Sequence, residues 1–173
     1  GILAQFNVHA QMLPLIDWDE LLAGERIIAR FDIVPSDTGY FFCEVNTDSS
    51  VGCTEVLDCL NVYASALGSS LADTLPSPNL DKARLIKRLV EKHALTRVII
   101  FGLHMYAGDG FPSMELERAY FQAEMPDVPV EIVDEFTYPK PLLDAEQGRK
   151  TLVYRIGVFS DMDTDCRALF GQI

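Results

Sequence analysis

Basic residues are scarce in this chain. Its 173 residues include 14 Lys and Arg against 26 Asp and Glu, which gives a formal net charge of -12. A protein that binds along a nucleic acid needs clustered Lys and Arg to neutralise phosphates, so this balance argues against a nucleic-acid partner. Long apolar runs are also lacking, and none approaches the roughly 18 residues that cross a bilayer. The sequence therefore predicts no nucleic-acid partner and no membrane span.

Paired cysteines are lacking as well. The four cysteines, which are Cys43, Cys53, Cys59 and Cys166, form no C-x-x-C motif and have no His close by in sequence. That spacing does not predict a zinc site. No signal peptide is recognisable. We therefore expect buried thiols in a protein of the reducing cytoplasm.

Phosphate-binding glycine motifs are a third absence. The segment Gly102–Pro112, "GLHMYAGDGFP", lies between an expected strand and an expected helix, where α/β folds place ligands. It has neither G-x-G-x-x-G nor the Walker lysine. A substrate contact through His104 or Tyr106 and a plain turn both remain open.

What is present predicts an α/β fold. Hydrophobic residues make up 49% of the chain, which is enough for a substantial core. Strands are expected over 26–34 and 40–46 with a turn between them, and a helix over about 52–67. Later, helices are expected within 80–94 and over 112–124, and strands over 97–102, 128–134 and 150–158. We therefore expect a β-hairpin and helix at 1–75, leading into a Rossmann-like unit with parallel strands at 76–173.

The expected hairpin holds four polar residues among bulky apolar ones: Arg30, Asp32, Glu44 and Asn46. Alternate side chains of a strand point to opposite faces. In the expected register, Val34 faces Tyr40 across a five-residue turn. Arg30 then faces Glu44, and all four polar side chains share one face. A slip of one residue would separate them, so the register decides whether a site exists.

Two carboxylates and an amide oxygen are ligands that suit Mg²⁺, which usually shares them with substrate phosphates. The neighbouring guanidinium of Arg30 could stabilise charge on a phosphoryl group during transfer. A second interpretation remains open. In it the four residues are the solvated face of an amphipathic hairpin, and Arg30 forms an ordinary cross-strand pair with Glu44.

The hairpin sequence also resembles a known motif. "ARFDIV…GYFFCEVNTDSSVG" is similar to the "RFD…E-x-N-x-D-(S/T)" segment of glutathionylspermidine synthase-like enzymes, the circularly permuted ATP-grasp ligases. The later segments "VIIFG", "VEIVD" and "TLVYRIG" resemble the Rossmann-like pre-ATP-grasp domain of these enzymes. The resemblance covers about residues 26–160.

The resemblance implies an ATP-dependent carboxylate–amine ligase that works through an acyl phosphate on small-molecule substrates. It implies that Mg²⁺ is held by Asp32, Glu44 and Asn46, and that Arg30 faces the phosphates of ATP as a catalytic residue. It also implies contacts to the nucleotide or the carboxylate substrate from Thr47, Asp48, Ser49, Ser50 and Arg155.

The ATP-holding lysines and the adenine pocket of these enzymes have no counterpart after residue 160. We therefore expect an incomplete ATP site, as in a fragment of such a ligase. A non-catalytic α/β binding or assembly module is the alternative, and the sequence leaves a homodimer open.

Overall fold

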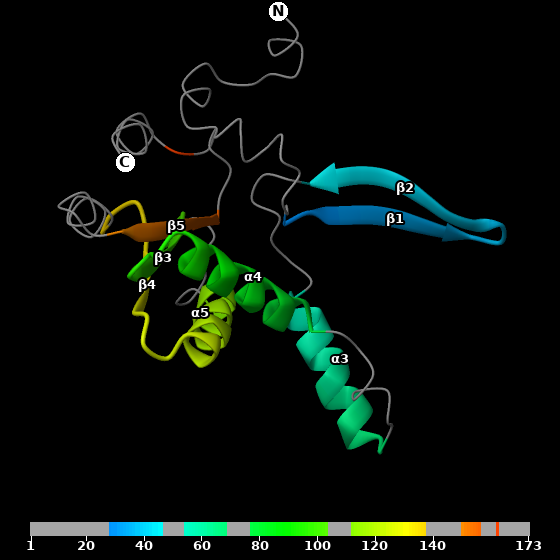
Figure 1. Ribbon diagram of the computed structural model, residues 1–173. Coiled ribbons are helices and arrows are strands. Elements are labelled where there is room, and N and C mark those ends of the chain that lie inside the picture. Colours follow the sequence, from blue (N-terminus) through cyan, green and yellow to red (C-terminus); the bar gives the residue numbers. More distant parts are fainter. Residues whose placement is uncertain are drawn as a thin grey trace, which may run out of the picture.

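The computed structural model describes residues 28–46, 54–68, 77–103, 112–137 and 150–156, together with Met162. Its elements are β1 (Arg30–Ser36), β2 (Gly39–Asn46), α3 (Thr54–Ala66), α4 (Pro78–Lys92), β3 (Arg97–Gly102), α5 (Pro112–Glu124), β4 (Val130–Val133) and β5 (Thr151–Ile156). β1 and β2 form an antiparallel hairpin, and the other three strands form a parallel sheet (Figure 1). The α/β class predicted from the sequence is confirmed. The division at residue 75 stays a prediction.

β3 is the central strand of the parallel sheet, whose order is β4-β3-β5. Every residue of β3 is buried. Val98 and Ile100 pack against the helices, whereas Ile99 and Phe101 point to the opposite face and are also fully buried. The continuously apolar sequence of this strand predicted burial on both faces, and the predicted bounds agree with the observed ones.

α4 and α5 lie against one face of this sheet (Figure 1). Their inward side chains form one core with the sheet: Ala83, Ile86 and Val90 from α4, and Met114 and Phe121 from α5. α4 begins at an N-cap, where the hydroxyl of Ser77 accepts a hydrogen bond from the amide of Leu80 at 3.3 Å. No helix in the described parts of the chain is long and apolar enough to cross a membrane.

α4 ends in a Schellman motif that turns the chain into β3. The amide of Leu95 donates to the carbonyl of Val90 at 2.9 Å, and the amide of Ala94 donates to that of Glu91 at 3.2 Å. Ala94 has φ 49, a left-handed conformation that L residues other than Asn and Asp rarely adopt. After α3 the equivalent position is occupied by Gly68, with φ 65.

The hairpin turn is tighter than the sequence predicted. Its two turn residues are Asp37 and Thr38, because Ser36 already pairs with Gly39. Gly39 has φ 138, which favours glycine at this position. The hydroxyl of Ser36 accepts a hydrogen bond from the amide of Thr38 at 3.2 Å. The hairpin extends away from the parallel sheet, with this turn at its far end (Figure 1).

The predicted register of the hairpin is wrong. Val34 faces Phe41 instead of Tyr40, and Ile33 faces Phe42. The register then shifts at a β-bulge, where Cys43 is the additional residue on β2.

Beyond the bulge, Asp32 faces Glu44 and Arg30 faces Asn46. The predicted Arg30–Glu44 pairing is therefore replaced by two other cross-strand pairs. The prediction that all four polar side chains share one face is confirmed, because directly paired residues lie on the same face and residues 30 and 32 alternate regularly.

Candidate functional site

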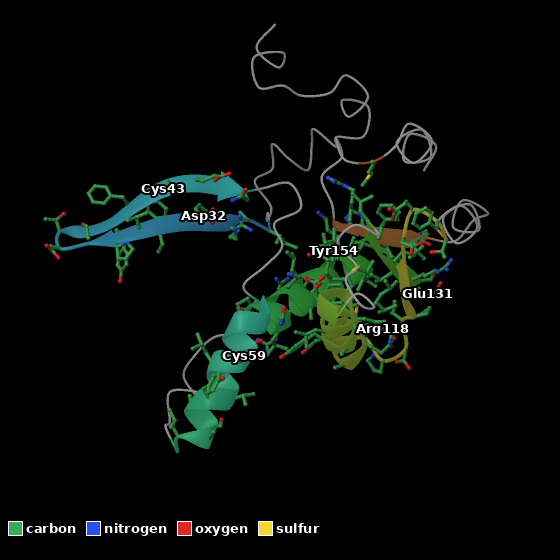
Figure 2. The ribbon with its side chains drawn as sticks, turned by 180° about the vertical axis from the view of Figure 1, so that it is seen from behind. Asp32, Cys43, Cys59, Arg118, Glu131 and Tyr154 are labelled. Carbon is green, nitrogen blue, oxygen red and sulfur yellow. The ribbon has the colours of Figure 1, made fainter. Side chains whose placement is uncertain are left out.

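The polar quartet of Arg30, Asp32, Glu44 and Asn46 lies at the end of the hairpin opposite the turn (Figure 2). The guanidinium Nε of Arg30 donates to Oδ1 of Asp32 at 2.9 Å. These two side chains are 39% and 41% exposed, respectively, so the ion pair is reachable from solvent without being fully solvated.

The amide of Asn46 links the remaining members of the quartet. In one orientation its nitrogen donates to Oδ2 of Asp32 at 3.4 Å. In the opposite orientation its nitrogen donates to Oε1 of Glu44 at 3.1 Å, and its oxygen accepts from Nη2 of Arg30 at 3.1 Å. The second arrangement gives shorter hydrogen bonds and joins all four residues in one network, because Arg30 also contacts Asp32.

The quartet depends on the bulge. With the tight turn alone, regular alternation would place Glu44 opposite Phe31 on the other face of the hairpin. The additional residue Cys43 moves Glu44 and Asn46 onto the face of Arg30 and Asp32. Two carboxylates against one guanidinium leave the quartet with one negative charge, which favours a bound cation.

The donor set of the quartet fits Mg²⁺ that arrives with phosphates. Mg²⁺ prefers oxygen ligands and is commonly held by one or two carboxylates, with water and phosphate oxygens completing the shell. Asp32 and Glu44 supply two carboxylates on adjacent strands. Asn46 supplies an amide oxygen in the first orientation of its side chain, in which its nitrogen donates to Asp32. In the described part of the chain, no three His, Cys, Asp or Glu side chains gather as a metal site. The quartet is therefore suited to a shared ion and poorly suited to holding a bare one.

The other predicted site residues are not brought into this network. Thr47, Asp48, Ser49 and Ser50 lie outside the described residues. Arg155 lies on β5 and faces Phe101 of β3, so it belongs to the parallel sheet rather than to the hairpin. Of the predicted loop 102–112, only Gly102, Leu103 and Pro112 are described. The structure therefore joins the predicted metal ligands with Arg30, and it leaves the predicted substrate contacts as predictions.

A second polar cluster lies inside the helical layer, and the sequence analysis missed it. Lys82 of α4 forms an ion pair with Glu117 of α5, and the two side chains are 7% and 5% exposed. The Lys82 Nζ lies 5.7 Å from the ring centroid of Tyr154 on β5. Burial raises the pKa of the Tyr154 hydroxyl above its ordinary range, and the charge of Glu117 and a hydrogen bond to it raise it further.

Helical spacing could have revealed this cluster. Lys82 stands four residues before the core residue Ile86, and Glu117 stands four residues before Phe121. Both charged residues therefore fall on the buried stripes of their helices. The arrangement ties α4, α5 and β5 together through one charged network.

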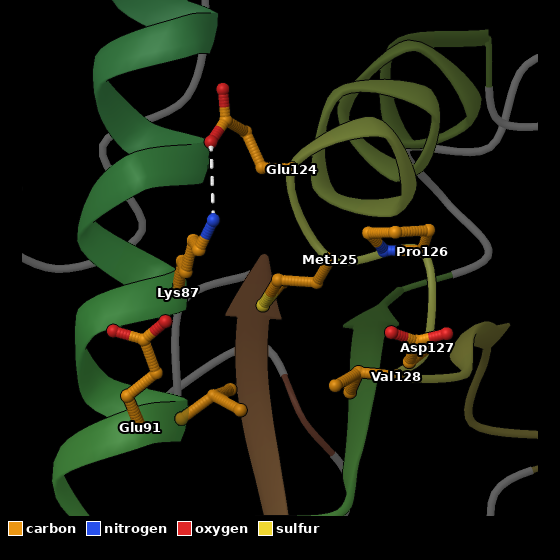
Figure 3. Close-up of a pocket in the computed structure, with 8 residues that line it drawn as sticks. Lys87, Glu91, Glu124, Met125, Pro126, Asp127 and Val128 are labelled. Atoms are coloured by element: carbon orange, nitrogen blue, oxygen red, sulfur yellow. Dashed lines mark ion pairs between the residues drawn. The ribbon is translucent and has the colours of Figure 1, made fainter.

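A shallow hollow of about 220 Å³ lies between α4 and the end of α5 (Figure 3). Its floor is apolar, from Val90, Met125, Pro126 and Val128, and its rim is charged, from Lys87, Glu91, Glu124 and Asp127. Lys87 and Glu124 form an ion pair of 3.9 Å across the rim. The hollow lies near the amino ends of the strands, away from the carboxyl ends where ligands bind in α/β sheets.

The cysteines differ from the expectation. Cys43 and Cys59 are free and exposed (Figure 2), so their predicted burial is wrong. Cys43 is exposed because the hairpin extends away from the sheet. Cys53 and Cys166 lie outside the described residues.

Comparison of the chain with protein-family models, curated proteins and solved structures gives no match. The function is therefore inferred from the residues and their geometry.

Proposed function

We propose that the polar quartet is the Mg²⁺-contacting part of an ATP-dependent carboxylate–amine ligase of the circularly permuted ATP-grasp type. The observation that supports this proposal best is the direct pairing of Asp32 with Glu44, beside a guanidinium and an amide. In this reaction a small-molecule carboxylate takes the terminal phosphoryl group of ATP, and an amine then displaces phosphate from the acyl phosphate.

Each member of the quartet has a role in this proposal. Asp32, Glu44 and the oxygen of Asn46 would hold Mg²⁺, which when bound neutralises charge on the phosphates. Arg30, oriented by its contact with Asp32, would face the phosphoryl group and offset the charge that develops on it. By resemblance, residues 47–50 and Arg155 would contact the nucleotide or the carboxylate.

The proposal assigns only part of an ATP site to this chain. The lysines and the adenine pocket that the resemblance calls for would come from other segments. A cytoplasmic location belongs to the same proposal, since ATP is supplied there and exposed thiols such as Cys43 and Cys59 stay reduced.

Paramagnetic Mn²⁺ tests the proposal directly because it replaces Mg²⁺ at oxygen ligands and broadens nearby NMR signals. We expect Mn²⁺-ATP to broaden the amide signals of residues 30–32 and 44–46 at concentrations that leave the turn unaffected. Asp32→Asn and Glu44→Gln should each weaken this effect at least tenfold. Asp37→Asn is the matched control, because it removes one carboxylate from the exposed turn of the same hairpin.

Stability provides a second control for these variants. The Arg30–Asp32 pair is about 40% exposed, and an ion pair at such a position contributes at most about 1 kcal/mol. The variants should therefore remain folded. Broadening that follows exposed carboxylates in general, with Asp37→Asn losing as much as Asp32→Asn, would refute a metal role for the quartet.

A non-catalytic binding or assembly module is the second candidate. It is favoured by the many large apolar side chains that are exposed on the hairpin and on α3. Loss of the Mn²⁺ effect at the quartet together with self-association of the chain would favour this candidate over the ligase.

A further inference from the structure

We propose that the chain forms a two-fold dimer by reciprocal exchange, in which the apolar face of each hairpin packs on α3 of the other copy. This inference is independent of the proposed ligase function. It rests on two exposed apolar surfaces of the same chain, their lack of charge and their combined area.

The first surface is the face of the hairpin opposite the quartet. The register places six side chains on it, which we call the apolar hairpin face: Phe31, Ile33, Pro35, Tyr40, Phe42 and Val45. Phe31 and Phe42 already form an edge-to-face pair with ring centroids 5.9 Å apart. Even so, Phe42 and Tyr40 are each 72% exposed and Phe31 is 54% exposed. The face is thus apolar, yet open to solvent.

The second surface is a stripe formed by Leu60 and Tyr63 of α3 and by Leu67, which directly follows the helix. These residues are spaced three and four apart, so they lie on one side of the helix. They are 49%, 68% and 83% exposed, respectively. We call them the α3 stripe. An apolar stripe of this kind normally faces a partner element.

The apolar hairpin face has no helix packed against it. A two-stranded hairpin is marginally stable alone, and packing against a helix is one way to stabilise it. In Figures 1 and 2, the hairpin and α3 of one chain extend in different directions, so the two surfaces are not packed on each other. A second copy supplies both missing partners at once, because its α3 covers the hairpin and its hairpin covers α3.

The distribution of charge also favours contact through the apolar hairpin face and the α3 stripe. The chain carries a net charge of -12, so two copies repel each other over most of their surface. The apolar hairpin face contains no charged residue, because Arg30, Asp32 and Glu44 lie on the opposite face. The segment 59–68 that carries the α3 stripe also contains no charged residue. Contact through these surfaces buries no unpaired charge.

The combined area is sufficient for a stable dimer. A large side chain buries about 200 Å², so the six exposed fractions above amount to roughly 800 Å² per copy when both surfaces are fully covered. A standard interface takes about 800 Å² from each partner. The hairpin face alone would fall short of this, which favours exchange over a hairpin-to-hairpin contact.

Sedimentation velocity of the 173-residue chain tests the proposal. We expect a dimer at micromolar concentrations. Phe42→Lys and Tyr63→Glu should each raise the dissociation constant at least tenfold, because each places a charge in the interface. Phe41→Lys should leave it within about twofold, since Phe41 is 60% exposed and lies on the other face of β2. The helical far-UV circular dichroism signal of each variant should match the wild type, because all three side chains are at least 60% exposed and lie outside the core of α4, α5 and the parallel sheet.

A mixing experiment identifies which surfaces meet. A mixture of the Phe42→Lys and Tyr63→Glu chains should form heterodimers, because one interface is then native and the other pairs lysine with glutamate. A wild-type chain that stays monomeric at 100 micromolar would overturn the proposal. So would a Tyr63→Glu chain that still dimerises, since this would leave α3 outside the interface.

Discussion

The buried pair of Lys82 and Glu117 is a single-residue feature with a large expected effect on stability. Both side chains are more than 90% buried, so removing one partner leaves a charge without compensation in the core. Lys82→Met should therefore lower the free energy of unfolding by about 3–5 kcal/mol, measured by urea denaturation.

Two matched variants show whether the loss comes from the unpaired charge. Adding Glu117→Gln to Lys82→Met removes that charge and keeps a polar partner for Tyr154, so at least half of the lost stability should return. Arg118→Met breaks the exposed pair with Glu115 and should cost less than about 1 kcal/mol. A Lys82→Met loss no larger than that of Arg118→Met would show that the buried pair is not important for folding.

The raised pKa of Tyr154 predicts how the stability of the protein changes at high pH. The pKa of its hydroxyl is raised in the folded protein, chiefly by burial, whereas in the unfolded chain the hydroxyl loses its proton near pH 10. Above that pH the folded state holds a proton that the unfolded state has lost. The free energy of unfolding therefore falls as pH rises, by at most about 1.4 kcal/mol per pH unit from this group, and is unaffected by it below about pH 9.

The measurement compares urea unfolding of the wild type and Tyr154→Phe between pH 8 and pH 11. Other titrating groups contribute equally to both proteins, so the difference between the two slopes isolates Tyr154. Parallel curves across the whole range would contradict the raised pKa.

At the scale of the element, the two described helix ends with left-handed residues give opposite predictions. Ala94 ends α4 with φ 49, and Gly68 ends α3 with φ 65. Ala94→Gly relieves a strain of about 1–2 kcal/mol but adds freedom to the unfolded chain, so we expect a net gain of about 0.5 kcal/mol. Gly68→Ala should cost about 1 kcal/mol, although no neighbouring atom obstructs a Cβ there.

Thermal unfolding of the two single variants and of the double variant checks this pair. The two effects should add, because the positions belong to different helix ends. A loss of stability in Ala94→Gly would mean that the conformation of Ala94 carries little strain.

Element types were largely predictable from the sequence, and some bounds were as well. β3 agrees with its predicted range because six consecutive residues of "RVIIFG" suit a doubly covered strand. α5 begins at Pro112, where proline fits the first turn of a helix. In both cases a local signal coincides with the tertiary environment.

The register of the hairpin was not predictable in the same way. The turn residues suggested a loop by composition, but they could not show that Gly39 closes a two-residue turn. The bulge at Cys43 has no compositional signal either. The shared face of the quartet was nevertheless predictable, because a five-residue turn without a bulge and a two-residue turn with a bulge both leave residues 30, 32, 44 and 46 on one side. The burial of Lys82 was missed because lysine is rarely buried.

At the scale of the whole molecule, net charge should control self-association. Two copies of charge -12 repel each other, and salt screens this repulsion. We therefore expect the dissociation constant of the proposed dimer to fall several-fold when sodium chloride rises from 20 to 200 mM, measured by sedimentation velocity. An interface held by ion pairs would respond in the opposite direction, so weakening by salt would contradict an uncharged interface.

The additional residue on β2 has a consequence for how this chain tolerates changes in length. Deletion of Cys43 would remove the bulge, so that β1 and β2 pair without interruption and Glu44 stays opposite Asp32. Gaining a residue at the same point would leave two residues without cross-strand partners, or would turn Glu44 toward the aromatic side. The deletion of one residue at this point should therefore disturb the hairpin less than the insertion of one. Sequence variants shortened at this position should preserve the pairing of Asp32 with Glu44 more often than lengthened ones.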